Sequence, residues 1–118
     1  MIREFVPFDE DTIQKELDEL PPRDAAKLVS LMEHYEQCGL GNPSPVQIDD
    51  YGDGLYRLRH IKPAYQGRLL FFAQDCSAGM ERLVMLVVYK KQGHKVPQHI
   101  LETAKKRKKQ WEIKRGKR

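Results

Sequence analysis

The sequence contains very little cysteine. Of its 118 residues only Cys38 and Cys76 are cysteines, and they do not form a CxxC pair. Small disulfide-stapled domains and zinc knuckles both need more cysteines at closer spacing than this. These two classes of protein are therefore excluded, and the composition fits a reducing compartment.

Long hydrophobic segments are also missing. The longest apolar run, residues 83–89, is far shorter than the roughly 20 residues that a membrane-spanning helix needs. The first six residues, Met-Ile-Arg-Glu-Phe-Val, lack the apolar core of a signal peptide. We therefore expect a cytoplasmic protein that has no membrane partner.

Motifs for nucleotide cofactors and metal ions are absent as well. Neither a P-loop nor a GxGxxG motif occurs, and no Ser-His-Asp or Cys-His arrangement is indicated. Asp49, Asp50 and Asp53 are close in sequence, but aspartates grouped in this way are typical of turns rather than of metal sites. We expect a protein that uses no cofactor and no metal.

Acidic residues are scarce after the first third of the chain. Residues 1–40 hold 10 acidic and 4 basic side chains, whereas residues 41–118 hold 7 acidic and 17 basic ones. The overall content, 40% hydrophobic and 32% charged, is that of an ordinary globular domain. Such a basic region favours a polyanionic partner, usually nucleic acid, although it also serves as a solvated surface.

Hydrophobic periodicity predicts secondary structure along the whole chain. Residues 1–8 read as a strand, followed by a helix that Asp9 or Asp11 caps and by a second helix that begins at Pro22 and ends at Gly39. Glycines, prolines and paired aspartates predict a loop over residues 39–54. The remaining elements are strands over 54–61, 68–74 and 82–89 and a helix that opens at Pro97.

This order, β-α-α-β-β-β-α, predicts an α+β fold. The short connections among the last three strands favour antiparallel pairing. We expect a mostly antiparallel four-stranded sheet, covered on one face by the helical hairpin, with Leu58, Leu86 and Val88 in the core between them. Residues 1–112 form one domain, and residues 113–118 form a basic tail that is frayed from Lys114 onward.

Basic side chains are predicted to converge on the sheet face opposite the hairpin. Arg57 and Arg59 are two residues apart, so both project from the same face of one strand. Arg68 begins the neighbouring strand. Four further candidates follow the third strand, namely Lys90, Lys91, His94 and Lys95.

A cluster of this kind suits RNA cleavage without a metal ion. The RNA 2′-hydroxyl attacks its own phosphate when a base accepts its proton, and arginines and lysines stabilise the charge that develops on phosphorus. Crowded cations lower one another's pKa, which makes a lysine a candidate base, and His94 is a candidate acid or base. The same cations also fit a sheet that merely faces solvent, and the pattern alone leaves that alternative open.

The final helix has two different faces. Ile100, Ala104 and Trp111 share one, and we interpret Trp111 as its packing anchor. The other face is the run of basic residues 105–109. We predict that RNA phosphates are bound by Lys95, Lys105, Lys106, Lys108 and Lys109; a water-facing role is the alternative.

Four segments, in this order and spacing, resemble the RelE/ParE superfamily and are most similar to its phage-derived HigB-like branch. They read LYRLR at residues 55–59, GRLLFF at 67–72, LVVYKK at 86–91 and VP at 96–97. Ala104 and Arg107 fill a further A-x-x-R pattern. The resemblance covers residues 52–111.

The resemblance implies a RelE-like fold and the toxin of a type II toxin–antitoxin pair. Such toxins cut mRNA in the ribosomal A site and are neutralised by a cognate antitoxin protein. By this resemblance Arg57 and Arg59 match the paired basic strand positions. Arg68 matches a phosphate contact, and Lys90 and Lys91 match the basic pair after the last strand.

One departure from the RelE pattern leaves the proton donor open. RelE uses a tyrosine in the segment where this sequence has Pro97, Gln98 and His99, so His94, Lys95 and His99 are all candidates. Two other functions also stay open. ParE-type relatives share the fold but inhibit gyrase, and a phage-derived protein that binds nucleic acid without cutting it is the third alternative.

Overall fold

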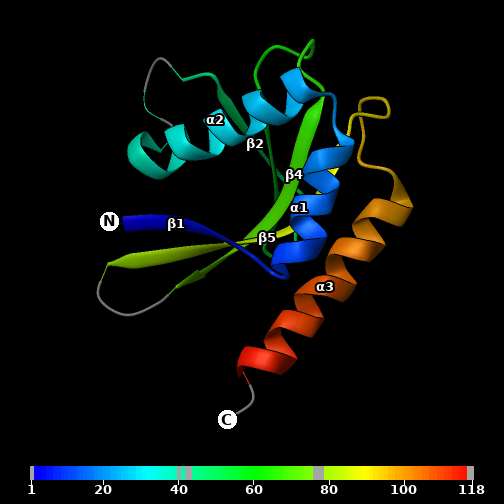
Figure 1. The fold of residues 1–118 in the computed structure, drawn as a ribbon. Coiled ribbons are helices and arrows are strands. Elements are labelled where there is room, and N and C mark those ends of the chain that lie inside the picture. Colours follow the sequence, from blue (N-terminus) through cyan, green and yellow to red (C-terminus); the bar gives the residue numbers. More distant parts are fainter. Residues whose placement is uncertain (1, 40, 42–43, 76–78, 117–118) are drawn as a thin grey trace.

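Eight elements follow one another in the computed structural model, which describes residues 2–39, 41, 44–75 and 79–116 (Figure 1). They are β1 (Ile2–Pro7), α1 (Glu10–Glu19), α2 (Pro22–Cys38), β2 (Val46–Asp50), β3 (Leu55–His60), β4 (Gly67–Asp75), β5 (Met80–Lys90) and α3 (Gln98–Gly116). The α+β class is confirmed. The sequence predicts a short hairpin connection over residues 75–80, between β4 and β5, and residues 76–78 of it lie outside the described residues.

The strands form one mixed sheet of five strands in the order β1-β5-β4-β3-β2. β2 to β5 pair antiparallel, whereas β1 lies parallel to β5 along the opposite edge. The prediction of four strands in the order β-α-α-β-β-β-α was wrong because it placed β2 inside a loop. Val46 and Ile48 alternate with polar residues and pack on the core, but the nearby prolines and aspartates suggested a turn.

The two helices of the hairpin begin and end where the sequence predicted. Asp9 is the N-cap of α1, and its carboxylate accepts the Thr12 N–H at 3.0 Å. Pro22 lies in the first turn of α2. Gly39 ends α2 with φ of 62°, a backbone conformation that favours glycine. These local signals determine where the two helices begin and end.

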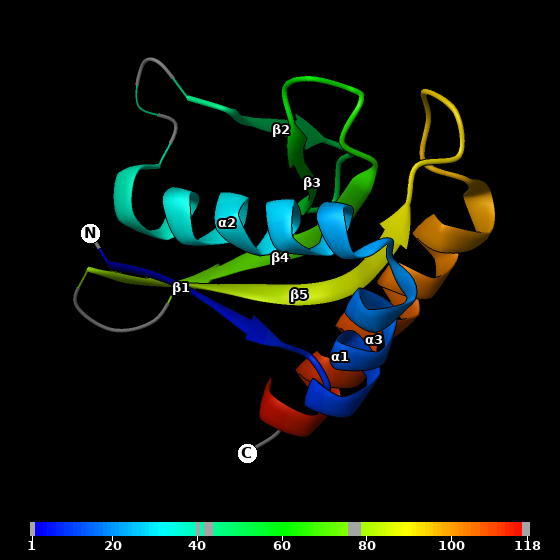
Figure 2. The ribbon, with the colours of Figure 1, turned by 45° about the horizontal axis from the view of Figure 1, so that its top comes forward.

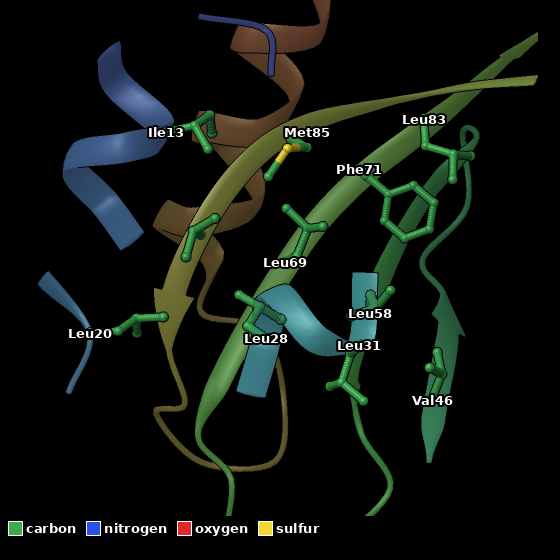
Figure 3. Close-up of a cluster of buried hydrophobic side chains, with 11 residues drawn as sticks. Ile13, Leu20, Leu28, Leu31, Val46, Leu58, Leu69, Phe71, Leu83 and Met85 are labelled. Carbon is green, nitrogen blue, oxygen red and sulfur yellow. The ribbon is translucent and has the colours of Figure 1, made fainter. Parts of the chain in front are cut away.

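The helical hairpin covers one face of the sheet, as predicted, and α3 covers part of the other face, which the prediction did not include (Figure 2). On the hairpin face, Leu28 and Leu31 of α2 lie over Leu69 and Leu58 (Figure 3). On the other face α3 packs on β4 and β5 through its predicted apolar residues, with Trp111 only 4% exposed. α3 continues to Gly116, into the predicted tail.

A β-bulge in β5 changes which face of the sheet the later side chains of this strand point to. Leu70 of β4 pairs with Val87, but the next residue, Phe71, pairs with Met85, so Leu86 is an extra residue on β5. Leu86 and Val87 therefore both pack on the α3 face. The expected position of Leu86 beside Leu58 and under the hairpin was wrong, because strict alternation does not hold across a bulge.

Two side chains hold the bulged part of β5 in place. β1 reaches along β5 only to Pro7, which lies opposite Met85. Beyond that point Glu16 of α1 accepts the Val88 N–H at 2.9 Å and a hydrogen bond from Arg107 of α3 at 2.8 Å. Arg107 also donates to the Leu86 carbonyl at 2.9 Å. We call Glu16 and Arg107 the bulge clamp; it satisfies backbone groups that β1 does not reach.

Within the described part of the chain, no helix has the length and apolar character that crossing a membrane requires.

Replacing Glu16 tests the clamp. Glu16→Ala should lower the free energy of unfolding by about 2–3 kcal/mol, because it removes the acceptor of both Val88 and Arg107 in a mostly buried position. Glu16→Gln keeps a hydrogen-bond acceptor, so its free energy of unfolding should fall by less. Urea denaturation measures both variants beside Glu19→Ala, an exposed change on the same helix that should stay within about 0.5 kcal/mol. Equal stability of the two alanine variants would contradict a role for the clamp.

Candidate functional site

Five of the predicted basic residues line one pocket on the α3 face of the sheet. The pocket has a volume of about 320 Å³ and lies where α3 leaves β3 and β4 uncovered. Its lining includes Arg57, Arg59, Arg68, Lys91 and His94, together with Ile61, Pro63 and Gly93. We call it the cationic pocket. The structure therefore brings these five predicted residues together on the sheet face opposite the hairpin.

Arg57 and Arg59 share one carboxylate. Asp49, opposite Arg57 on β2, accepts from Nε and Nη2 of Arg57 at 3.0 and 2.9 Å and from Nε of Arg59 at 3.1 Å. Burial acts to raise the pKa of Asp49, but the two arginines more than compensate and hold it below its ordinary value of 3.8. Asp49 therefore stays charged and fixes both guanidinium groups.

The sequence did not predict that Asp49 belongs with the arginines of the pocket. The interpretation of Asp49 as a turn residue was wrong, because it belongs to β2 and faces β3 across the strand pair. The alternation of Val46 and Ile48 with polar residues was the available signal. A carboxylate directly opposite an arginine is a favourable cross-strand pair.

Arg68 is the most deeply buried cation of the pocket, with 2% of its surface exposed. Its Nη1 donates to the carbonyls of Tyr65 at 2.7 Å and Gly67 at 3.1 Å. No carboxylate of the described residues lies within ion-pair distance of it. Burial lowers the pKa of Arg68, and the charges of Arg57 and Arg59 lower it further. The Arg68 charge is thus desolvated and forms no direct ion pair with a described carboxylate, which favours an anion beside it.

The β-bulge determines which strand-end lysine enters the pocket. Beyond it Tyr89 packs on the α3 face, and Lys91, two residues further, lines the cationic pocket. The Lys91 N–H donates to the Gln66 carbonyl at 2.8 Å, so its backbone is fixed. Lys90 is exposed and lines a different groove, beside Glu16 and α3. The predicted pair Lys90 and Lys91 is therefore divided between two surfaces.

Tyr89 lies beneath the pocket as a buried polar neighbour of Arg57. Burial raises its pKa above the ordinary value of 10.0, although the Arg57 charge opposes the shift. For Arg57 itself, burial lowers the pKa, but Tyr89 and Asp49 outweigh this effect and raise it above its ordinary value. Tyr89 therefore stays protonated and Arg57 stays charged at neutral pH.

The other predicted RNA-binding residues are dispersed. Lys95 is exposed and does not line the pocket. On α3, Lys105, Lys106 and Lys109 are exposed, but Lys108 is half-buried, with its ammonium 5.2 Å from the centroid of the Phe72 ring. Arg107, expected on the same basic face, points to Glu16 instead. The basic face of α3 is therefore smaller than its sequence suggests.

Within the described residues, no three His, Cys, Asp or Glu side chains gather where they could hold a metal ion. The Asp49 carboxylate is occupied by two arginines instead. The chemistry that the pocket offers is the binding of a phosphate by several cations.

Comparison with known proteins identifies one matching protein family. The family described as Phage derived protein Gp49-like (DUF891) matches residues 15–109. The matched segment runs from α1 to α3 and includes every residue that lines the cationic pocket as well as Asp49. No curated protein matches the chain.

The ion pairs of Asp49 predict a specific dependence of stability on pH. The folded-state pKa lies below 3.8, so the contribution of Asp49 is complete above about pH 4–5 and is lost as the pH falls through the folded-state value. Asp49→Asn should therefore be less stable than the wild type by about 1–2 kcal/mol at pH 6, and this difference should shrink below about pH 4.

Urea denaturation at several pH values measures this difference. Asp50→Asn is the matched control, because Asp50 is exposed and accepts only a turn N–H, which asparagine also accepts. A difference between wild type and Asp49→Asn that is independent of pH would contradict the ion-pair role.

Proposed function

The chain belongs to the Gp49-like family of phage-derived proteins, and on this premise we propose that it is the toxin of a type II toxin–antitoxin system. The family is related to the RelE and HigB toxins. We propose further that the protein is a cytoplasmic endoribonuclease of the RelE/HigB kind, which cuts mRNA on the ribosome without a metal ion.

The observation that carries this proposal is the cationic pocket. Arg57, Arg59, Arg68 and Lys91 surround one concave site that has room for a phosphate group, and a single carboxylate balances only two of them. A site that concentrates positive charge in this way stabilises the extra negative charge of a phosphorane more than that of the ground-state phosphate.

In the proposed reaction the 2′-oxygen of a nucleotide attacks the adjacent phosphorus. The O2′–P bond forms and the P–O5′ bond breaks, which leaves a 2′,3′-cyclic phosphate and a free 5′-hydroxyl. A base accepts the proton of the 2′-hydroxyl, and an acid donates a proton to the departing 5′-oxygen. Both products are therefore formed without any co-reactant.

We assign the two proton transfers to Lys91 and His94. Arginine stays protonated in proteins, so Arg57, Arg59 and Arg68 serve as fixed charges that hold the phosphate. Lys91 and His94 are the pocket residues with side chains that exchange protons. The antitoxin, in this proposal, neutralises the toxin by covering the cationic pocket.

Replacing each of the two lysines at the end of β5 separately tests the site. Lys91→Gln should reduce cleavage by about 10²-fold or more, because it removes a side chain assigned to proton transfer together with its charge beside the phosphorane. Lys90→Gln removes the same charge one residue away but outside the pocket, and should leave cleavage close to wild type. Primer extension on mRNA from cells that briefly express each variant measures the breaks.

The same cells separate the alternatives. Codon-phased breaks that disappear in Lys91→Gln support the nuclease. Growth arrest with intact messages would overturn it and favour gyrase inhibition. An absence of arrest would favour a protein that binds nucleic acid without cutting it. Equal loss of cleavage in both lysine variants would contradict the assignment of Lys91 to the site.

A further inference from the structure

A second group of cations surrounds Tyr65, next to the cationic pocket. The Arg23 guanidinium lies 4.7 Å and the Lys27 ammonium 4.8 Å from the centroid of the Tyr65 ring. Both residues are on α2, one turn apart, and Tyr65 is in the connection between β3 and β4, which also carries Lys62. We call Arg23, Lys27, Lys62 and Tyr65 the Tyr65 patch. Cation–π contacts hold two of its charges in fixed positions.

The positive charges of the Tyr65 patch are not compensated by acids. In the described segments no carboxylate lies within 4.0 Å of the charged nitrogens of Arg23, Lys27 or Lys62, whereas other cations of the protein do form ion pairs. The nearest acid along α2, Asp24, is buried and accepts the Gln66 N–H at 3.0 Å. Three cations side by side without an acid favour a polyanion.

The Tyr65 ring packs against the ring of His60. His60 is buried, and its ring centroid lies 4.6 Å from that of Tyr65. Its Nδ1 accepts the Lys62 N–H at 2.8 Å. Burial and the charges of Lys27 and Lys62 lower the pKa of His60, so its ring stays neutral. The platform under the cations is therefore packed and hydrogen-bonded.

The Tyr65 patch and the cationic pocket share one wall. Ile61 and Pro63 line the pocket, while Lys62 and Tyr65 of the same connection belong to the patch. The Tyr65 carbonyl also accepts a hydrogen bond from Arg68. In Figures 1 and 2 this connection lies beside the first turn of α2, with the segment between β5 and α3 nearby. An RNA chain that leaves the pocket across this connection would therefore run toward Arg23 and Lys27.

We propose that the Tyr65 patch binds the phosphate backbone of RNA that extends beyond the cationic pocket. The inference deepens the proposed function and rests on it for the identity of the polyanion. The recognised chemistry is a row of phosphodiesters, contacted by charge rather than by base edges. Such a row of phosphodiesters can belong to either of two RNA molecules: the mRNA whose phosphate occupies the pocket, or the ribosomal RNA around it.

The test measures binding of RNA that the protein does not cut. Fluorescence anisotropy with a 2′-O-methyl oligonucleotide of about 12 nucleotides gives the affinity at several salt concentrations. Each phosphate contact with single-stranded nucleic acid contributes about 0.7 to the slope of log K against log salt. The double variant Arg23→Gln, Lys27→Gln should therefore lower the slope by about 1.4 and weaken binding roughly 10- to 30-fold at about 0.1 M salt.

Two control variants accompany it. Lys15→Gln with Lys114→Gln removes the same charge from exposed positions elsewhere and should change the slope by much less. Arg23→Lys with Lys27→Arg keeps both charges and should retain binding, which separates loss of charge from damage to the fold. Sedimentation with ribosomes repeats the comparison for the second RNA source.

Each outcome decides between the possibilities. A reduced slope with the oligonucleotide assigns the Tyr65 patch to the bound strand, and a loss seen only with ribosomes assigns it to ribosomal RNA. Unchanged binding in both assays, or equal loss in the Lys15 and Lys114 variant, would overturn the inference while the nuclease proposal stands. The opposite outcome is also distinguishable. If the protein cuts no mRNA but its RNA binding depends on the Tyr65 patch, the nuclease proposal is overturned and the inference about the patch stands.

Discussion

The bulge clamp is the interaction on which the arrangement of the site depends. Glu16 and Arg107 come from the first and last helices, and both bond to the backbone of β5 where β1 no longer accompanies it. The clamp stabilises a stretch of strand in which two consecutive residues face α3. Because of that bulge the residues at the end of β5 face the opposite way, so Lys91 lines the cationic pocket and Lys90 does not. The composition of the pocket therefore depends on a contact between two helices and a strand.

Electrostatics divides the cations of this protein into two kinds. Arg57 and Arg59 are fixed by Asp49 and present ordered guanidinium groups at little cost in conformational entropy. Arg68 and Lys91 have no carboxylate beside them in the described structure and supply the net field of the cationic pocket. The same division recurs in the Tyr65 patch, where an aromatic ring takes over the ordering role of the carboxylate. Order and net charge are thus provided by different partners.

The sequence predicted those parts of the structure that depend on local chemistry. Caps at Asp9 and Gly39, the periodicity of α2 and α3, and the same-face spacing of Arg57 and Arg59 all determine structure over a few residues. The bulge at Leu86 was not predictable, because it depends on Glu16 and Arg107, which are distant in sequence. β2 was missed for a related reason: its short alternation is decisive only once β3 supplies Arg57 opposite Asp49.

The parallel pairing of β1 with β5 also has a consequence for folding during translation. A nascent chain that has exposed only the hairpin and β2 to β4 still lacks the partner of its first strand, and Arg107 arrives later still. Contacts between such distant residues form late, after the loop-closure entropy has been paid. The cationic pocket is therefore assembled only after β5 and α3 have been synthesised, so a translation product that stops before them lacks the ordered site.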